Sequence, residues 1–345
     1  MDRPVAPLRP QDRVLVVRLG AVGDVIRALP AVHRIRLAFP QAHLAWVVED
    51  LAAPLLEGHA DLNEVIVLSR RELRAAGRHP ARLAATAATI RERLRRGRYD
   101  VAVDLQSTLK SAIVAFLAGA PRRVGFAATH CREGSFLFTN EWGRPSSPHL
   151  NRVDRNLEMA ALLGAAHGPV TAALGERPAE AAEAERILDR LGPSRGRPVI
   201  LCPGASRRQA FKRWPATAWS RLARLLSGAG RSPLIVWGPG EESLSKEIER
   251  DSRGEARLAP PTSLPVLAAL LRRSALFIGA DTGPMHLAWA VGCPVVALFG
   301  PTDPRLNAPV GPGHEVLRAP EGDLGRLAPE TVGAAALRVL QVGDR

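Results

Sequence analysis

The fold of this chain is decided by the stretch Leu276-Phe277-Ile278-Gly279-Ala280-Asp281-Thr282-Gly283-Pro284-Met285-His286-Leu287 and by the apolar run Pro294–Phe299 that follows it. It predicts a buried parallel strand, a turn of small residues, the start of a helix and then a second buried strand. Thr282 and Gly283 allow backbone to approach a ligand closely, and Pro284 is favoured in the first turn of a helix. Because the amides of that turn form an anion site, the stretch favours a phosphorylated ligand.

A second loop of this kind lies about seventy residues earlier in the chain. Pro203-Gly204-Ala205-Ser206 follows the strand-like run Val199–Cys202 and continues to Lys212-Arg213-Trp214. Small residues after a strand, followed by cations, suit phosphate as well. Two such loops in one half of the chain indicate a site for a nucleoside diphosphate.

Strand-like apolar runs alternate with helix-like periodic segments along the whole chain, which is typical of parallel sheets covered on both faces. In the first half we expect strands at 14–17, 44–48, 65–68, 101–104 and 123–125, and helices at 24–39, 51–57, 82–96 and 107–117. In the second half we expect strands at 199–202, 234–237, 276–278 and 295–299, and helices at 217–226, 241–250, 264–271 and 285–290. Pro30 predicts a kink or a restart of the first helix.

This alternation predicts an α/β protein of two Rossmann-like domains with parallel sheets that face each other across a cleft. The segment 164–178, rich in Ala, Gly and Pro, is the best boundary. We therefore expect an N-terminal domain at 1–165, a linker at 166–178 and a C-terminal domain at 179–345. The tail helix at 329–340 could pack on either domain.

The charge of the chain predicts acidic partners. Its 345 residues carry 47 Lys and Arg against 34 Asp and Glu, a net charge of +13. Nucleic acid, an anionic membrane surface and a phosphorylated substrate would all fit this charge. Aromatic residues make up only 4% of the chain, with a single tyrosine, Tyr99, so few platforms exist for stacking bases and no nucleic-acid partner is expected.

The cysteines and the apolar runs predict a cytoplasmic protein. Cys131, Cys202 and Cys293 show no metal-ligand spacing and are expected to be reduced thiols. No run reaches the roughly 18 apolar residues of a membrane span, and Met1–Pro10 has no apolar signal core. Any membrane association is therefore expected to be peripheral.

The first strand runs into Arg18-Leu19-Gly20-Ala21-Val22-Gly23-Asp24, a glycine-containing turn that opens a helix. Its spacing is not the GxGxxG of dinucleotide-binding proteins, and an acid at a helix start repels phosphate. A dinucleotide-binding oxidoreductase is thus disfavoured. The residues alone leave Asp24 open between a structural role at the helix start and a catalytic one.

Several short motifs together carry a resemblance to a known family. They are Gly20–Asp24 with Leu29-Pro30-Ala31, Gln106 with Lys110-Ser111, Arg132-Glu133, Asp281-Thr282-Gly283 with His286, and Phe299–Pro304. Over about residues 14–310 they resemble the bacterial lipopolysaccharide heptosyltransferases, the ADP-heptose-using glycosyltransferase family 9. The resemblance implies a GT-B fold, in which the C-terminal domain mainly holds the sugar nucleotide and the N-terminal domain the acceptor.

The resemblance also implies inverting chemistry without a metal or other cofactor, in agreement with the lack of an Asp-x-Asp metal motif. Asp24 corresponds to the family's proposed general base, which takes a proton from the acceptor hydroxyl. Lys212 corresponds to a lysine that offsets charge on the leaving ADP. These two residues are the catalytic candidates.

The donor-binding candidates come from the two loops described first and from one acid after a strand. Asp281, Thr282 and Gly283 would place amides at the diphosphate and the Asp281 carboxylate near the heptose hydroxyls. His286 could face the diphosphate or the core. Ser206 keeps the hydroxyl of the diphosphate-binding loop, and Glu241, preferred over its neighbour Glu242, could take the ribose hydroxyls.

On the acceptor side, Lys110 and Arg132, together with Arg123, correspond to positions that the family uses near an anionic acceptor. The expected reaction transfers heptose from ADP-heptose to 3-deoxy-D-manno-octulosonic acid (Kdo) linked to lipid A, at the anionic surface of the inner membrane. The acceptor-side motifs resemble heptosyltransferase I more than heptosyltransferase II. Heptosyltransferase II, or a family 9 transferase with another acceptor or nucleotide sugar, remains the alternative.

Overall fold

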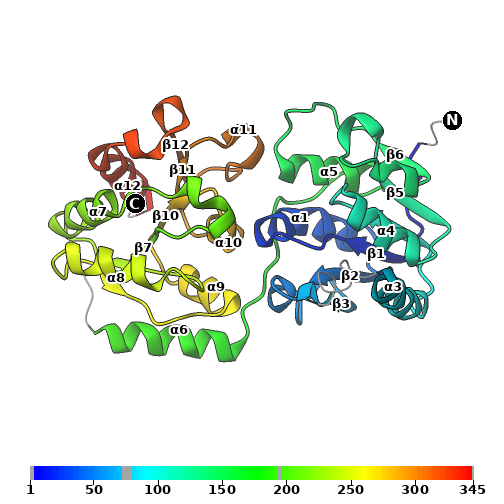
Figure 1. Ribbon diagram of the computed structural model, residues 1–345, viewed down its shortest axis with the longest axis horizontal. Helices are drawn as coiled ribbons and strands as arrows, with labels where there is room; N and C mark the ends of the chain where they lie inside the picture. The colour runs from blue at the N-terminus through cyan, green and yellow to red at the C-terminus, as the bar shows by residue number, and fades with distance from the viewer. Residues whose placement is uncertain (1–3, 72–79, 193–195, 344–345) are drawn as a thin grey trace. The chain divides into compact units, whose positions relative to one another are not determined.

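The computed structural model describes residues 4–71, 80–192 and 196–343 (Figure 1). The chain divides into two compact units, Met1–Gly175 (unit 1) and Glu176–Arg345 (unit 2). Each unit contains one sheet of six strands, and every strand pair in both sheets is parallel. The predicted α/β class with two parallel sheets is therefore confirmed.

The sheet of unit 1 has the strand order β3-β2-β1-β4-β5-β6. Its strands are β1 (Arg13–Val17), β2 (His43–Glu49), β3 (Glu64–Leu68), β4 (Val101–Asp104), β5 (Arg122–Phe126) and β6 (Glu141–Gly143). Its helices are α1 (Val22–Ala38), α3 (Pro80–Arg95), α4 (Leu109–Leu117) and α5 (Arg152–Leu162), with 3-10 turns η1 (Ala53–Leu55), η2 (Ala128–His130) and η3 (Ser135–Phe138).

Helices cover both faces of this sheet. Because parallel crossovers are right-handed, α1, which leads from β1 to β2, and α4, which leads from β4 to β5 in the opposite direction, lie on opposite faces. Helix α5 packs on α1, and α3 packs on α4. Every residue of the central strand β4 is buried, and in β1 only the first residue, Arg13, is partly exposed. Burial on both faces of the sheet explains the continuous apolar sequence of these strands.

Unit 2 repeats this topology with the strand order β12-β11-β10-β7-β8-β9. Its strands are β7 (Val199–Cys202), β8 (Pro233–Ile235), β9 (Arg257–Leu258), β10 (Leu276–Ala280), β11 (Val295–Phe299) and β12 (His314–Arg318). Its helices are α6 (Pro178–Leu191), α7 (Ala216–Gly228), α8 (Glu242–Asp251), α9 (Leu264–Arg272), α10 (Gly283–Ala290), α11 (Pro304–Asn307) and α12 (Pro329–Gly343), with turns η4 (Arg207–Lys212), η5 (Pro320–Gly322) and η6 (Leu324–Arg326).

The tail helix α12 belongs to the core of unit 2. It packs against α7 and strands β10 to β12. Val332, Ala335, Ala336 and Leu340 of this helix are buried in the same apolar cluster as Trp219 on α7. Helix α12 therefore covers one face of the second sheet.

The predicted helix at 51–57 and the predicted restart of the first helix at Pro30 are both wrong. The segment 51–57 forms only the single turn η1, because Pro54 disfavours helical backbone in the residue before it and Gly58 follows in a left-handed conformation (φ 72°). Helix α1 continues past Pro30 without a restart. Pro30 lies among buried residues that pack against α5, and this packing offsets the lost backbone hydrogen bond.

Several elements were not anticipated from the sequence. Strands β6 and β9 are only three and two residues long, and β12 is a half-exposed strand at the sheet edge with polar residues. Helices α5 and α6 were also missed. Helix α5 matters most, because it brings two arginines to the candidate site of unit 1.

Candidate functional site

Each unit has a topological switch point, at which neighbouring strands lead away in opposite directions. In unit 1 this point lies between β1 and β4, and in unit 2 between β7 and β10. Loops after such a strand pair diverge and leave a crevice at the carboxyl ends of the strands, where open α/β sheets bind their ligands. Most of the sequence-predicted site residues lie at or beside the switch point of their own unit, and Lys110 and Arg123 are exceptions.

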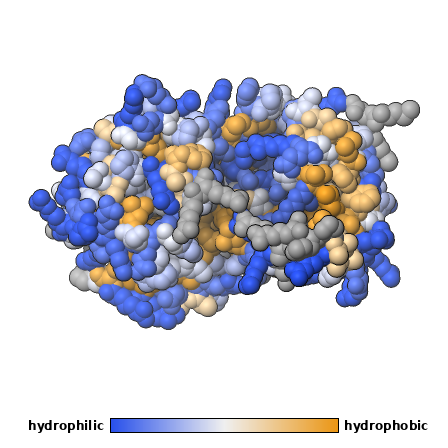
Figure 2. Space-filling model, in the orientation of Figure 1, coloured by the Kyte–Doolittle hydropathy of each residue, from blue (hydrophilic) through white to orange (hydrophobic). Residues whose placement is uncertain are grey.

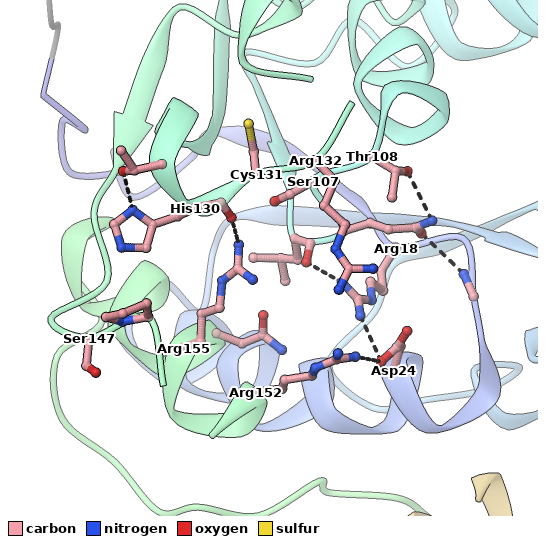
Figure 3. Close-up of a pocket in the computed structure, with 16 residues that line it drawn as sticks. Arg18, Asp24, Ser107, Thr108, His130, Cys131, Arg132, Ser147, Arg152 and Arg155 are labelled. Carbon is pink, nitrogen blue, oxygen red and sulfur yellow. Dashed lines mark hydrogen bonds and ion pairs between the residues drawn. The ribbon is translucent and has the colours of Figure 1, made fainter. Parts of the chain in front are cut away.

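Unit 1 has a pocket of about 290 Å³ at its switch point (Figure 3). Its lining is polar and strongly cationic, with four arginines and one carboxylate. The lining residues are Arg18, Gly20, Asp24, Leu105, Gln106, Ser107, Thr108, Thr129, His130, Cys131, Arg132, Ser147, Pro148, Arg152, Arg155 and Asn156. The pocket thus combines an acid with a surplus of positive charge.

Asp24 is held in the first turn of α1 by three guanidinium groups. Its Oδ1 lies 3.1 Å from Arg18 Nη2 and 3.3 Å from Arg152 Nη1, and it also accepts a hydrogen bond from Arg27. All three of these contacts are made by Oδ1. Burial alone would raise the pKa of Asp24, but the charges of Arg18, Arg27 and Arg152 outweigh it and hold the pKa well below the usual range. The three guanidinium groups thus favour the carboxylate form of Asp24, and they engage it through Oδ1.

Arg132 and Arg155 add further positive charge to the same pocket (Figure 3). Arg155 stacks over the Phe126 ring at 3.9 Å from its centroid and donates to the His130 carbonyl. Burial, and then the neighbouring arginines, lower the pKa of Arg155 to about 10. Cations crowded in this way repel one another, so the pocket favours an anionic ligand.

A buried acid fixes the loop that forms one wall of the pocket. Asp104, the last residue of β4, accepts hydrogen bonds from the backbone N–H groups of Gln106 (2.9 Å) and Ser107 (3.1 Å) and from Ser111 Oγ (3.0 Å). Burial raises the pKa of Asp104 to about 6 despite these bonds. Gln106 Oε1 in turn accepts from the Leu19 N–H at 2.8 Å. The loops after β1 and β4 are thereby joined into one rigid wall.

The two predicted acceptor residues are not brought together. Arg132 lines the pocket, whereas Lys110 lies outside the lining and pairs with Glu49, which also contacts Arg70 Nε at 3.3 Å. Arg123, the third candidate, donates to backbone carbonyls and stacks on Phe116. Of these three cations, only Arg132 shares the pocket with Asp24.

Sequence reasoning missed Arg18, Arg27 and Arg152, which contact Asp24, and Arg155, which lines the same pocket. Arg18 directly follows a predicted strand, a position that could have marked it. Arg152 and Arg155 are three residues apart at the start of α5, so recognising that helix would have placed them on one face. Nothing in the sequence connects this helix with Asp24, which is 128 residues away from Arg152.

In unit 2, Lys212 and Asp281 form a buried ion pair at the switch point. Lys212 Nζ donates to the Asp281 backbone carbonyl at 2.8 Å and to its Oδ2 at 3.0 Å, and His286 Nε2 lies 3.3 Å from Oδ1. Burial would raise the pKa of Asp281, but the contacts with His286 and Lys212 hold it well below the usual range. A lysine ammonium has three donors, so one remains for a ligand.

The start of α10 lies beside this pair. Thr282 is its N-cap residue, but the hydroxyl donates to the Ala280 carbonyl (3.3 Å) and no side chain caps the helix amides. The helix begins at Gly283, with Pro284 in its first turn. Uncapped amides, the positive end of the helix dipole and the neighbouring Lys212 together favour a phosphate group here.

Glu241 lies against the loop that follows β7. Its Oε2 accepts a hydrogen bond from the Gly238 N–H at 2.9 Å, and a Cβ on Gly204 would lie 1.8 Å from the same oxygen. Gly204 is thus required for this close approach. The alternative acid, Glu242, is exposed and pairs with Lys246 at 2.8 Å. Glu241 is therefore the acid that lies at the carboxyl ends of the strands.

The remaining donor candidates lie in the loops around these groups. Ser206 is exposed at the N-terminus of η4, and Arg213 donates twice to the Ala205 carbonyl, at 3.2 and 2.6 Å. The side chains of Arg207 and Arg208 lie outside the described part. Lys212, Asp281 and His286 are thus in direct contact, Thr282 and Gly283 lie in the same turn, and Ser206 and Glu241 flank the loop after β7.

The described residues contain neither a metal-binding cluster nor a membrane-spanning helix. They hold no group of three or more His, Cys, Asp or Glu side chains arranged to bind a metal ion. Among the same residues, no helix is both long and apolar enough to cross a bilayer. Cys202 and Cys293 are buried free thiols and Cys131 is a half-exposed one.

Comparison with known proteins gives consistent matches over most of the chain. Residues 87–330 match Glycosyltransferase family 9 (heptosyltransferase). Lipopolysaccharide heptosyltransferase 1 of Escherichia coli (strain K12) is 29% identical over 323 residues, which cover 93% of this chain and 98% of that protein.

Two solved structures of the E. coli heptosyltransferase WaaC, each 28% identical in sequence, resemble the fold. The match to the structure with ADP has a TM-score of 0.79 and covers 95% of this chain and 99% of the WaaC chain. The structure with ADP-2-deoxy-2-fluoro heptose has a TM-score of 0.77 and covers 96% and 99%. The predicted GT-B fold is thereby confirmed.

Proposed function

The chain belongs to glycosyltransferase family 9, and we propose that it transfers heptose from ADP-heptose to the Kdo residue of a lipid A-linked precursor of the lipopolysaccharide core. Family membership removes the oxidoreductase alternative. The observation that carries the donor assignment is the buried Lys212–Asp281 pair beside the uncapped start of α10. The fold that places it is shared with a heptosyltransferase whose structure contains an ADP-heptose analogue.

In this proposal the diphosphate of the donor binds at the start of α10. The first-turn amides and the remaining donor of Lys212 meet the charge that develops on ADP as the bond to the sugar breaks. Asp281 holds Lys212 and His286 in place, since each of its carboxylate oxygens faces one of them. Glu241 accepts hydrogen bonds from the ribose hydroxyls, and Ser206 donates to a phosphate oxygen. No metal ion is needed.

The acceptor binds in the pocket of unit 1, where Arg132, Arg152 and Arg155 meet its carboxylate and phosphate groups. The arginine contacts described above go to Asp24 Oδ1, and its other oxygen, Oδ2, accepts the proton of the acceptor hydroxyl. The hydroxyl oxygen bonds to the anomeric carbon from the face opposite ADP. The carbon–oxygen bond to ADP breaks with its electron pair, so the configuration at that carbon is inverted.

The arginines around Asp24 make it a weaker general base, because they lower the pKa of its carboxylate. Arg18 and Arg27 are buried, whereas Arg152 is about one third exposed and reaches Asp24 from α5. We infer that the anionic acceptor draws Arg152 away from Asp24. Losing one of three positive neighbours makes the carboxylate more basic only when the acceptor is bound.

The proposal is tested by transfer assays with purified donor and acceptor. ADP-heptose with a Kdo-containing acceptor should give an anomerically inverted product, and ADP should raise the melting temperature more than UDP, GDP or NAD does. Equal stabilisation by all four nucleotides would contradict the donor assignment. Transfer only to an acceptor that already carries heptose would establish the heptosyltransferase II alternative.

The location of the reaction follows from the acceptor. A lipid A-linked acceptor lies in the inner membrane, and the nucleotide sugar ADP-heptose is found in the cytoplasm. The enzyme would therefore act at the cytoplasmic face of the inner membrane, as a peripheral protein. The net charge of +13 supports attraction to an anionic lipid surface. Fractionation should release the protein with high salt and without detergent, because exposed charges are screened over roughly 8–10 Å at physiological salt.

A further inference from the structure

Helix α4 exposes an apolar face on the outside of unit 1. Leu109, Ile113 and Phe116, spaced by four and three residues, are 38%, 37% and 50% exposed. Leu137 on the adjoining turn η3 is 73% exposed. The turn packs against α4, and Phe138 meets Phe116 edge to face at 5.8 Å. We call these four exposed side chains, Leu109, Ile113, Phe116 and Leu137, the α4–η3 surface.

This surface is not explained by the core of unit 1. The helix α4 already supplies Val114 and Ala115 to that core, and Ala112 is buried as well. An amphipathic helix would present polar residues outward, whereas α4 is apolar on both sides. Figure 2 shows hydrophobic residues gathered over the region of α4 that Figure 1 labels. A continuous exposed apolar patch of this kind marks a contact with a partner or a membrane.

Cations border the α4–η3 surface. Arg123 stacks on Phe116 at 5.5 Å, Lys110 lies on α4 itself, and the Arg95 side chain reaches Gly119 just past the helix end. The segment 80–143, which contains α3, α4 and η3, holds 10 Lys and Arg against 5 Asp and Glu. One of these acids, Glu133, accepts a hydrogen bond from the Leu109 N–H. Apolar side chains within a basic rim complement an anionic lipid surface.

The surface begins next to the proposed acceptor pocket. Thr108, the N-cap residue of α4, lines that pocket, and Leu109 follows it directly. Arg132, another lining residue, lies five residues before Leu137 and donates its backbone N–H to Ser107 at 3.0 Å. A bilayer in contact with the surface would therefore hold its lipid-linked molecules beside the pocket.

We propose that the α4–η3 surface docks onto an anionic phospholipid bilayer, with its apolar side chains inserted at the headgroup level and its basic rim on the lipid charges. The docking itself follows from the exposed residues. The statement that it delivers the acceptor rests on the proposed function.

Binding to vesicles tests the docking with the full-length protein. The wild type should bind vesicles of phosphatidylglycerol and phosphatidylethanolamine at least about tenfold more tightly than phosphatidylcholine vesicles. The double variant Ile113→Ser/Leu137→Ser should lose at least about tenfold in affinity for the anionic vesicles. Val342→Ser, on α12 and also 73% exposed in the wild type, is the matched control and should bind as the wild type does.

Three results would overturn the proposal. The first is an affinity of the double variant for anionic vesicles equal to that of the wild type. The second is an equal affinity of the wild type for neutral and anionic vesicles. The third is a wild-type dimer, seen by ultracentrifugation, that the double variant does not form, since the surface would then pair two copies of the chain. Both variants should melt as the wild type does, because the replaced side chains are exposed. If the double variant does not fold, the single variant Leu137→Ser decides the question in the same assay.

Transfer assays with two forms of the acceptor, one soluble and one embedded in vesicles, distinguish this proposal from the proposed function. The double variant should transfer heptose to a water-soluble, deacylated acceptor at the wild-type rate but work at least about tenfold more slowly on the same acceptor embedded in vesicles. Equal rates on the embedded acceptor would contradict the delivery role. If the wild type glycosylates neither acceptor, the proposed function fails, while the vesicle affinities still decide whether the surface docks.

Discussion

Replacing Lys212 with methionine should destabilise unit 2 as well as impair transfer. The substitution keeps the length of the side chain and removes its charge. Of the described contacts of its carboxylate, Asp281 would then keep the one with His286, since Lys212 supplies the partner of Oδ2 and of the backbone carbonyl. Both side chains of the pair are less than a tenth exposed, so water cannot replace the lost contacts.

The size of the effect follows from the burial of this pair. Removing one partner of a buried ion pair costs about 3–5 kcal/mol in the free energy of unfolding, because an uncompensated charge is left behind. The contact between His286 and Oδ1 remains, so we expect a value near the lower end, about 3 kcal/mol. For a unit of this size, that loss lowers the melting temperature by roughly 6–12 °C.

Calorimetry of Lys212→Met, Asp281→Asn and the double variant tests this reasoning. The double variant has no buried charge left unpaired, so it should be more stable than Lys212→Met alone, while its transfer activity stays low because the diphosphate lacks its cation. A melting temperature of Lys212→Met within about 1 °C of the wild type would refute the argument. So would a double variant whose loss of stability is the sum of the two single losses.

The acid side of the stability curve provides a second check on the same pair. The pKa of Asp281 is lowered in the folded state, so its pairing stabilises the protein above the ordinary carboxylate pKa of about 4 and that contribution is lost as the pH falls below it. Lys212→Met removes one cause of the lowered pKa. The variant should therefore lose less stability than the wild type between neutral pH and pH 3.

Four further predictions concern the proposed site. Asp24→Asn should lower kcat by at least about 10²-fold and leave the affinity for ADP unchanged. A kcat within tenfold of the wild-type value would mean that Asp24 only balances the charge of the arginines that contact it. Arg152→Gln should raise the KM for the anionic acceptor about tenfold but not the KM for the donor, and equal rises would contradict an acceptor role. Gly204→Ala should displace the Glu241 carboxylate, and both this variant and Glu241→Gln should bind ADP about tenfold more weakly than the wild type. The melting temperature of each variant without ligand should change little. Wild-type ADP affinity in both variants would show that Glu241 is not part of the donor site. Transfer should continue at the same rate in EDTA, whereas a rate lost in EDTA and restored by magnesium would disprove the metal-free mechanism.

The sequence could predict the central strands of both sheets. The central strands of both sheets are continuous apolar runs, because residues buried on both faces leave no polar positions. The loop around Asp281 was also recognisable, since small residues, an acid and a proline follow such a run directly. These signals are local, so a single sequence contains them in full.

The surroundings of Asp24 could not be predicted in this way. Arg18, Arg27 and Arg152 reach it from the loop after β1, from α1 and from α5. With 47 Lys and Arg in the chain, the sequence gives no means of choosing these three. The pairing of Lys110 with Glu49, 61 positions earlier, is equally non-local, and it explains why one predicted acceptor residue lies outside the pocket.

The contrast between the two switch points supports the division of labour that we propose. In unit 1 the first turn of α1 carries its own acid, Asp24, which occupies the positive end of the helix dipole and repels phosphate. In unit 2 the acid at the switch point, Asp281, follows β10, precedes α10 and is turned to Lys212, so the amides of α10 stay without an acidic side chain. One topology thus yields an anion site in unit 2 and a carboxylate among cations in unit 1. A diphosphate leaving group suits the former, and an anionic acceptor that must give up a proton suits the latter.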